Sequence, residues 1–223
     1  MTLTIPEALM LLSRKNDTGE KQGQFVEYAL AGGALAELVL RKRLVPQDEA
    51  AKKFDLVDTS PTGDSFLDGC LAVLESKGSG RTATRYVRCL AGKSKLMREQ
   101  AKSLVRKGVL EEREKSFLIF NWTNYPERDS APEALMVQHL EKAIAGDIAL
   151  STQDRAAIAL ADKTGLLRKN FDKALLSANK KRIKSIAKGA EGPTKAAMNA
   201  IDAVIASIAA STAAVAAAGA SSG

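Results

Sequence analysis

Histidine and cysteine are scarce in this chain of 223 residues, which has one His and two Cys. A single histidine, His139, leaves little room for histidine-based catalysis or a zinc site, so we expect it on a helix surface or at a helix interface. Cys70 and Cys89 provide neither a disulfide framework nor the spacing of a metal site. We therefore predict two buried cysteines in a reducing compartment, and no metal.

Motifs of catalytic and nucleotide-binding sites are missing as well. AGKSK at 91–95 ends like a P-loop, but Val87 stands where that loop needs glycine. GSGRTA at 78–83 has the letters of a dinucleotide fingerprint, yet it follows an expected helix where the mechanism requires a strand. There is no nucleophile elbow, and Asp64 and Asp68 are better explained as a helix cap and a helix-surface charge. We expect no enzymatic activity and no cofactor.

Acidic residues are outnumbered, since 33 Lys and Arg against 26 Asp and Glu give a net charge of +7. Such an excess favours an anionic partner, either nucleic acid or an acidic membrane surface. Between Arg81 and Lys107 there are nine Lys or Arg, and Glu99 is the one acid. Within this run Lys95, Arg98, Lys102 and Arg106 share one helical face. A second basic run is KKRIK at 180–184, and a solvated helix surface is an alternative for both runs.

Aromatic residues are also few, namely six Phe, three Tyr and one Trp. Four of them lie within KSFLIFNWTNYPERD at 115–129. We predict a β-hairpin here, with arms Val109–Glu111 and Phe117–Asn121 and the charged residues EEREK in the loop. Apolar residues beside a basic run are typical of an interfacial membrane binder. Alternation alone allows FLIF to be either a buried element or a membrane anchor.

The chain opens without a signal peptide pattern, so we expect a cytoplasmic protein. Residues 203–223 carry no charge, but they are mostly Ala, Ser and Gly, which favour a packed final helix over a membrane span.

Helical periodicity predicts a mainly α, single-domain helical bundle over 1–223, with one or two small β-hairpins and a frayed tail from about 217. A capping box at Thr4 and Glu7 begins the first helix, which we expect to run through Lys15. The further helices are expected at 22–43, after Asp64 within SPTGDSFLDGCLAVLES, and at 82–91, 95–108, 132–145, 151–163 and 172–188. A strand is expected at 54–58, and a last helix from Pro193. Gly32 and Gly33 inside the second helix indicate close helix packing.

Several of these stretches resemble the Golgi phosphoprotein 3 family and its bacterial relatives. They are LTIPEALMLL…DTG at 3–19, LAGGALAELVLRKRL at 30–44, PTGDSFLDGCLAVL at 61–74 and LVRKGVL…FLIFNWTNYP at 104–126. The resemblance implies a helical domain on the cytosolic face of a membrane, with a protruding hydrophobic hairpin. Its membrane-inserting residues would be Phe117, Leu118, Ile119, Phe120 and Trp122.

Eukaryotic members of that family bind phosphatidylinositol 4-phosphate and retain glycosyltransferases through their cytosolic tails. The four pocket positions are occupied here by Gln22, Ala31, Ser94 and Met97, all of which depart from the family's Trp and Arg pattern. Arg85, Arg88, Lys95 and Arg98 are our substitute candidates for binding the head group or another anion. The resemblance therefore implies a divergent, prokaryotic member whose partners are anionic phospholipid membranes and membrane-protein tails.

Two other functions fit parts of the sequence. SLVRKGVLEEREKSFLIF has the pattern of a winged-helix nucleic-acid-binding module, although an acidic wing tip would disfavour DNA. A scaffold for the tails of other proteins could coexist with membrane docking.

Overall fold

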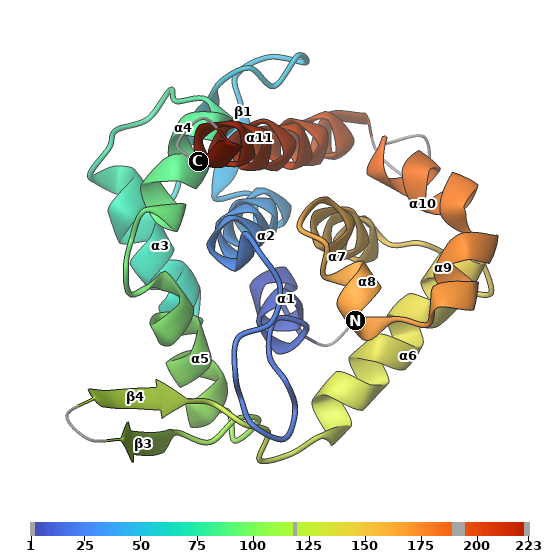
Figure 1. Ribbon diagram of the computed structural model, residues 1–223. Helices are drawn as coiled ribbons and strands as arrows, with labels where there is room; N and C mark the ends of the chain where they lie inside the picture. Colours follow the sequence, from blue (N-terminus) through green and yellow to red (C-terminus); the bar gives the residue numbers. More distant parts are fainter. Residues whose placement is uncertain (1–2, 118–119, 189–194, 221–223) are drawn as a thin grey trace.

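The computed structural model describes residues 3–117, 120–188 and 195–220, without the side chains of 117, 120, 195–198 and 219–220 (Figure 1). The helices are α1 (Ile5–Leu11), α2 (Val26–Leu40), α3 (Ser65–Glu75), α4 (Ala83–Ala91), α5 (Leu96–Arg106), α6 (Ala131–Ala145), α7 (Thr152–Lys163), α8 (Leu167–Asn170), α9 (Lys173–Ala178), α10 (Lys180–Ala187) and α11 (Lys195–Ala220). Strands β1 (Leu44–Pro46) and β2 (Phe54–Leu56) form one antiparallel sheet, and β3 (Arg113–Phe117) and β4 (Phe120–Asn124) form another. The mainly α fold with small hairpins is confirmed.

Helix α2 lies at the centre of the molecule, with α1, α4, α7 and α11 packed around it (Figure 1). Apart from Glu27 and Glu37 its residues are mainly apolar, and 12 of its 15 residues are buried, which is the pattern of a central helix. A Cβ on Gly32 would stand 2.9 Å from Ile208 Cδ1 of α11, and one on Gly33 would stand 2.9 Å from Leu9 Cδ1 of α1. The close packing expected at these two glycines is confirmed.

Two predicted helix starts are confirmed by their hydrogen bonds. The Thr4 hydroxyl accepts from Glu7 N, and the Glu7 carboxylate accepts from Thr4 N, which completes a capping box. The Asp64 carboxylate accepts from the backbone N–H groups of Phe66 and Leu67 at the start of α3. Each cap satisfies backbone donors that a helix N-terminus leaves unpaired.

Some predicted boundaries were wrong. Helix α1 ends at Leu11 rather than Lys15, because the backbone beyond it bonds across a loop, with Lys15 N donating to Glu20 O and Gln22 N donating to Ser13 O. The helix expected at 172–188 is divided into α9 and α10 at Asn179, whose side-chain amide donates to Leu175 O. Such side-chain bonds to the backbone compete with helix continuation.

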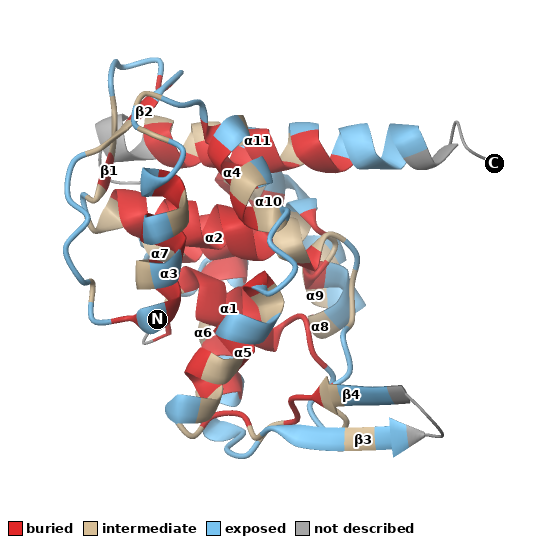
Figure 2. Ribbon diagram, turned by 90° about the vertical axis from the view of Figure 1, so that its left-hand side faces the viewer, coloured by how far each residue is buried: buried red, intermediate tan, exposed pale blue. Residues whose placement is uncertain are grey.

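Helix α11 has a packed half and an exposed half. Ala200 to Ile208 pack against α2, α4 and α7, whereas residues 213–218 are exposed and extend beyond the body of the molecule (Figure 2). By length and composition, its Asn199–Ala218 stretch could span a bilayer, and 44% of the most apolar window is buried. The helix is continuous to Ala220, past the point where fraying was expected, and residues 221–223 and Pro193 lie outside the described part.

Candidate functional site

The β3–β4 hairpin has a different register from the one predicted. The charged residues of EEREK were expected in the loop, but Arg113 to Lys115 form most of strand β3. The ladder pairs Arg113 with Asn124 and ends where Phe117 pairs with Phe120. The connection between the arms is therefore Leu118 and Ile119, which lie outside the described residues. FLIF thus occupies the end of the hairpin, and the charges lie along one of its arms.

The hairpin projects from the body of the molecule, on the same side as the exposed end of α11 (Figure 2). Glu114, Ser116 and Asn121 are exposed, and Trp122 has 45% of its surface exposed. Trp122 pairs across the ladder with Lys115. An exposed Trp beside a Lys is a common combination at the membrane–water interface.

The base of the hairpin is fixed to the body. Glu111 N donates to Pro126 O, and the Asn124 amide donates to Thr18 O of the loop between α1 and α2. Tyr125, which follows β4, is buried and donates its hydroxyl hydrogen to Glu112 Oε1. Burial, together with the nearby Glu112 carboxylate, raises the pKa of Tyr125 to about 12. The projecting strands are thus held by a base that is ordered by polar contacts.

Two arginines accompany Tyr125 at this base. The Arg14 guanidinium lies 5.5 Å from the centre of the Tyr125 ring. The positive charge of Arg98 on α5 acts on Tyr125 as well, and partly offsets the rise in the tyrosine pKa. Arg14 is buried, burial lowers its pKa, and its Nε has no hydrogen-bond partner among the described residues. A buried cation with a free donor attracts an anion. Sequence reasoning missed Arg14, because only tertiary packing brings it to Tyr125.

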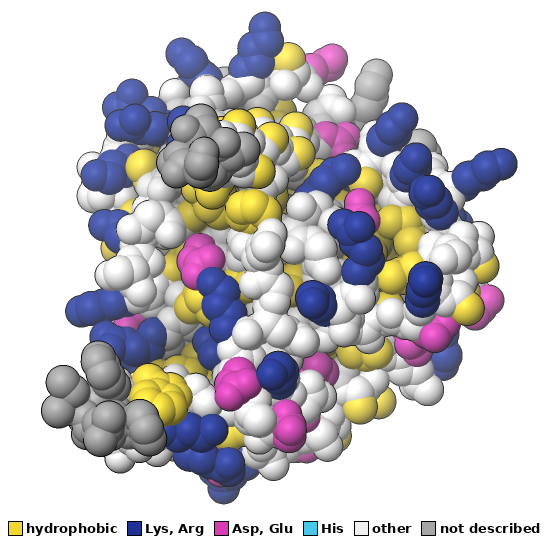
Figure 3. Space-filling model, viewed as in Figure 1, with side chains coloured by type: hydrophobic (Ala, Val, Ile, Leu, Met, Phe, Trp, Pro, Cys, Tyr) yellow, Lys and Arg dark blue, Asp and Glu magenta, His cyan; other side chains and the backbone are white. Residues whose placement is uncertain are grey.

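The four candidate anion-binding residues are all exposed, and they come from helix α4 and from helix α5 with its N-cap. Arg85 and Arg88 belong to α4, and Arg98 belongs to α5. Lys95, at the N-cap of α5, instead lines a cavity that faces α3. Figure 3 shows Lys and Arg side chains spread over one face of the molecule, including several beside the hairpin at lower left. This arrangement suits attraction to an extended negative surface.

The positions aligned with the family's head-group pocket hold other side chains, with other contacts. Gln22 uses its amide to donate to Leu12 O, Arg14 O and Asn170 Oδ1, so it ties the α1–α2 loop to the end of α8. Ala31 is fully buried in α2, Ser94 is exposed, and Met97 packs against the core. None of these side chains offers the guanidinium forks that hold a phosphate from fixed directions.

A large open pocket of about 800 Å³ lies next to the hairpin base, with residues from α6, α8 and the α1–α2 loop. Glu133 of α6 lines it and is buried. Burial and the neighbouring Glu127 carboxyl raise the pKa of Glu133 to about 8. The two carboxyls therefore hold one proton more than separate carboxyls would at neutral pH.

The remaining polar candidates have structural contacts. His139 Nε2 lies 2.9 Å from Asp154 Oδ1 and joins α6 to α7. The Asp68 carboxylate accepts from both the backbone and the hydroxyl of Thr62, and the second Asp64 oxygen accepts from Lys107 Nζ at 3.0 Å. Both cysteines are free thiols, with Cys70 buried and Cys89 only half-buried. The described residues contain no group of three acidic, His or Cys side chains suited to a metal ion.

Comparison with known proteins gives two findings. The sequence profile of the family described as Golgi phosphoprotein 3 matches residues 5–207. Vacuolar protein sorting-associated protein 74 of Eremothecium gossypii is 32% identical over 152 residues. That alignment covers 58% of this chain and 45% of the relative, so the match spans less than half of the relative's length. The hairpin lies inside the family match, whereas the exposed end of α11 lies beyond it.

Proposed function

Because the chain belongs to the Golgi phosphoprotein 3 family, we propose that it is a peripheral membrane protein that docks on anionic bilayers through the β3–β4 hairpin. It acts on the cytosolic face of a membrane, by binding rather than by catalysis. The relative's name places that protein in vacuolar protein sorting, which supports a further role for this chain as an adaptor for the tails of membrane proteins.

The projecting hairpin is the observation that carries this proposal. Its end consists of Phe117, Leu118, Ile119 and Phe120, and the exposed Trp122 follows on β4. An isolated two-stranded hairpin is marginally stable in water, and the exposed Trp122 adds little to the folding of this one. Inserted among lipid head groups, the same residues remove apolar surface from water.

Charge supplies the second part of the interaction. Lys115 lies beside Trp122, and Arg14 and Arg98 lie at the base near Tyr125. Near an anionic surface each cation contributes about 1 kcal/mol, and salt screens the attraction. The end of α11 that extends on the same side carries no charge after Asp202, so it does not repel that surface.

Binding therefore follows the charge of the membrane rather than one head group. Ala31, Ser94 and Met97 cannot grip a phosphate stereospecifically, and the exposed cations are dispersed. Charge reversal of Arg85 with Arg88, or of Lys95 with Arg98, should give graded losses of vesicle binding. A preference for phosphatidylinositol 4-phosphate over phosphatidylserine vesicles of equal charge that survives high salt would contradict this part of the proposal.

The decisive variant is Leu118→Ser with Phe120→Ser. It should weaken flotation with phosphatidylserine-containing vesicles at least about tenfold, because the inserted apolar area is lost. Circular dichroism should show an unchanged fold.

The matched control replaces two apolar residues that are exposed elsewhere, Val57→Ser with Leu135→Ser. This control should bind vesicles like the parent protein. A folded hairpin variant that also floats like the parent would refute insertion. A gel shift with duplex DNA tests the nucleic-acid alternative on the same samples.

A further inference from the structure

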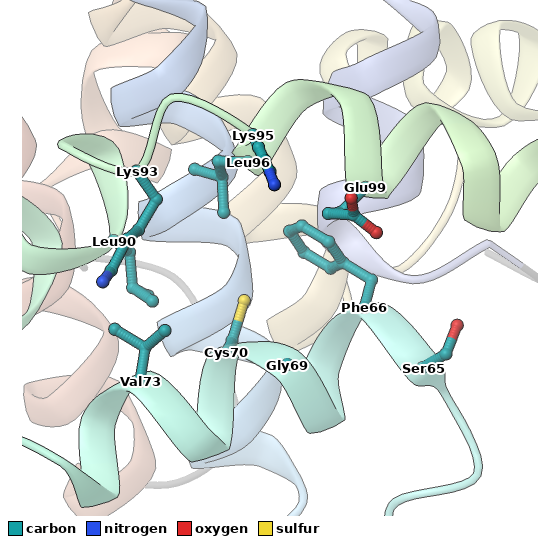
Figure 4. Close-up of a pocket in the computed structure, with 10 residues that line it drawn as sticks. All are labelled: Ser65, Phe66, Gly69, Cys70, Val73, Leu90, Lys93, Lys95, Leu96 and Glu99. Carbon is teal, nitrogen blue, oxygen red and sulfur yellow. The ribbon is translucent and has the colours of Figure 1, made fainter.

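A second site lies away from the hairpin, in a cavity of about 220 Å³ between α3, α4 and α5 (Figure 4). Its walls are mainly apolar. Phe66, Cys70 and Val73 of α3 form one side, with Leu90 of α4 and Leu96 of α5 opposite. Burial raises the pKa of the Cys70 thiol to about 12, so the sulfur stays protonated and adds neutral surface to the wall.

Cations lie at the mouth of this apolar space. Lys93 and Lys95 lie just before α5, and both side chains extend toward the cavity (Figure 4). Neither lysine has an ion pair with another described residue. Glu99 contributes one opposing charge, so the lining carries a net positive charge.

We propose that this cavity binds a single-chain anionic amphiphile of the fatty-acid class, with its aliphatic chain inside and its carboxylate at Lys93 and Lys95. Apolar walls of this kind accept apolar ligands, because binding removes apolar surface from water. The volume is below the roughly 300–1,000 Å³ of drug-sized pockets, so the chain that fits is short. A two-chain membrane lipid is too large, which makes this site independent of vesicle docking.

A larger residue at Gly69 would reduce the volume of the cavity and so test the proposal. It lines the cavity from the exposed side of α3, and a Cβ there would meet nothing within 4 Å. Gly69→Leu therefore starts from a Cβ that meets open space, places apolar atoms at the cavity, and favours the helix, since Leu has a higher helix propensity than Gly. Ala72→Leu adds a similar side chain to an exposed position of α3 outside the cavity, and serves as the matched control.

The test is isothermal titration of the full chain with sodium octanoate and, separately, with octylammonium chloride. Octanoate should bind saturably with one site, and octylammonium should bind about tenfold more weakly because its charge is reversed. Gly69→Leu should lower octanoate affinity at least about tenfold, while Ala72→Leu should not change it.

Substitutions of the charged residues at the mouth of the cavity should change octanoate affinity in opposite directions. Lys93→Gln with Lys95→Gln should weaken octanoate binding by roughly fivefold to tenfold, and Glu99→Gln should strengthen it. Absence of saturable octanoate binding, equal binding of octylammonium, or unchanged binding in Gly69→Leu would each overturn the proposal. Because the cavity contains no residue of the hairpin, each of these results would leave the proposal of vesicle docking unaffected.

Discussion

The β1–β2 and β3–β4 sheets are both two-stranded and antiparallel, yet their side chains have opposite surroundings. Leu44 and Phe54 of the first sheet are buried in the core. In the second sheet, Glu114 and Asn121 are exposed and Trp122 is the chain's one exposed tryptophan. The first sheet is therefore part of the hydrophobic core, whereas the second projects from the body and is held at its base. This difference is what the proposed membrane contact of the second hairpin would explain.

The largest expected effect concerns stability. Phe54→Ala should lower the free energy of unfolding by about 3–5 kcal/mol, because it removes a fully buried aromatic ring. Trp122→Ala should change it by less than about 1 kcal/mol. Urea denaturation followed by circular dichroism measures both variants without relying on tryptophan emission. Comparable destabilisation by the two substitutions would mean that the hairpin belongs to the core after all.

A smaller effect is expected from cations beside the hairpin. Lys115→Gln with Arg98→Gln removes two positive charges, each contributing about 1 kcal/mol near an anionic surface, or roughly fivefold in affinity. Lys180→Gln with Lys184→Gln removes two exposed charges from α10 and is the matched control. Vesicle co-sedimentation at low salt should show the loss in the first double variant and a much smaller one in the second. Equal losses would indicate that net charge alone, and not its place beside the hairpin, controls docking.

A pH-dependent effect is expected from the carboxyl pair next to the hairpin base. The pKa of Glu133 is about 8 when folded and ordinarily 4.5, so the folded protein retains a proton that the unfolded chain releases. This stabilisation is complete below about pH 4.5 and is lost as the pH rises through about 8. Between about pH 5 and about 8 the free energy of unfolding should fall by roughly 3 kcal/mol. Glu133→Gln should remove most of that slope in thermal unfolding, and an identical slope in the variant would rule out this pair as its source.

Local features were predictable from the sequence because their causes are local. The capping box at Thr4 and Glu7 and the cap at Asp64 depend on residues within one turn. Gly32 and Gly33 indicated close packing, although the partners Ile208 and Leu9 could not be named. The family resemblance, carried by motifs such as PTGD, is confirmed by the match over 5–207.

Features that depend on distant partners were not predictable. The charged residues looked like a loop by composition, but cross-strand pairing with residues 120–124 places Arg113 to Lys115 in a strand. Arg14 meets Tyr125 only after the α1–α2 loop packs on the hairpin base. The cavity at Gly69 forms from three helices, and nothing in the sequence indicated that Lys95 would line it.

The central claim is that the hairpin enters the membrane, and Trp122, the one tryptophan of the chain, reports on it directly. Its emission should be recorded with phosphatidylserine-containing vesicles and with neutral phosphatidylcholine vesicles, with binding measured by flotation in parallel. If the hairpin inserts, the Trp122 emission should shift to the blue and become protected from aqueous quenchers with the anionic vesicles. Neither change should occur in the Leu118→Ser, Phe120→Ser variant. Flotation of the parent protein with anionic vesicles while Trp122 keeps its aqueous emission and full quencher access would contradict the account.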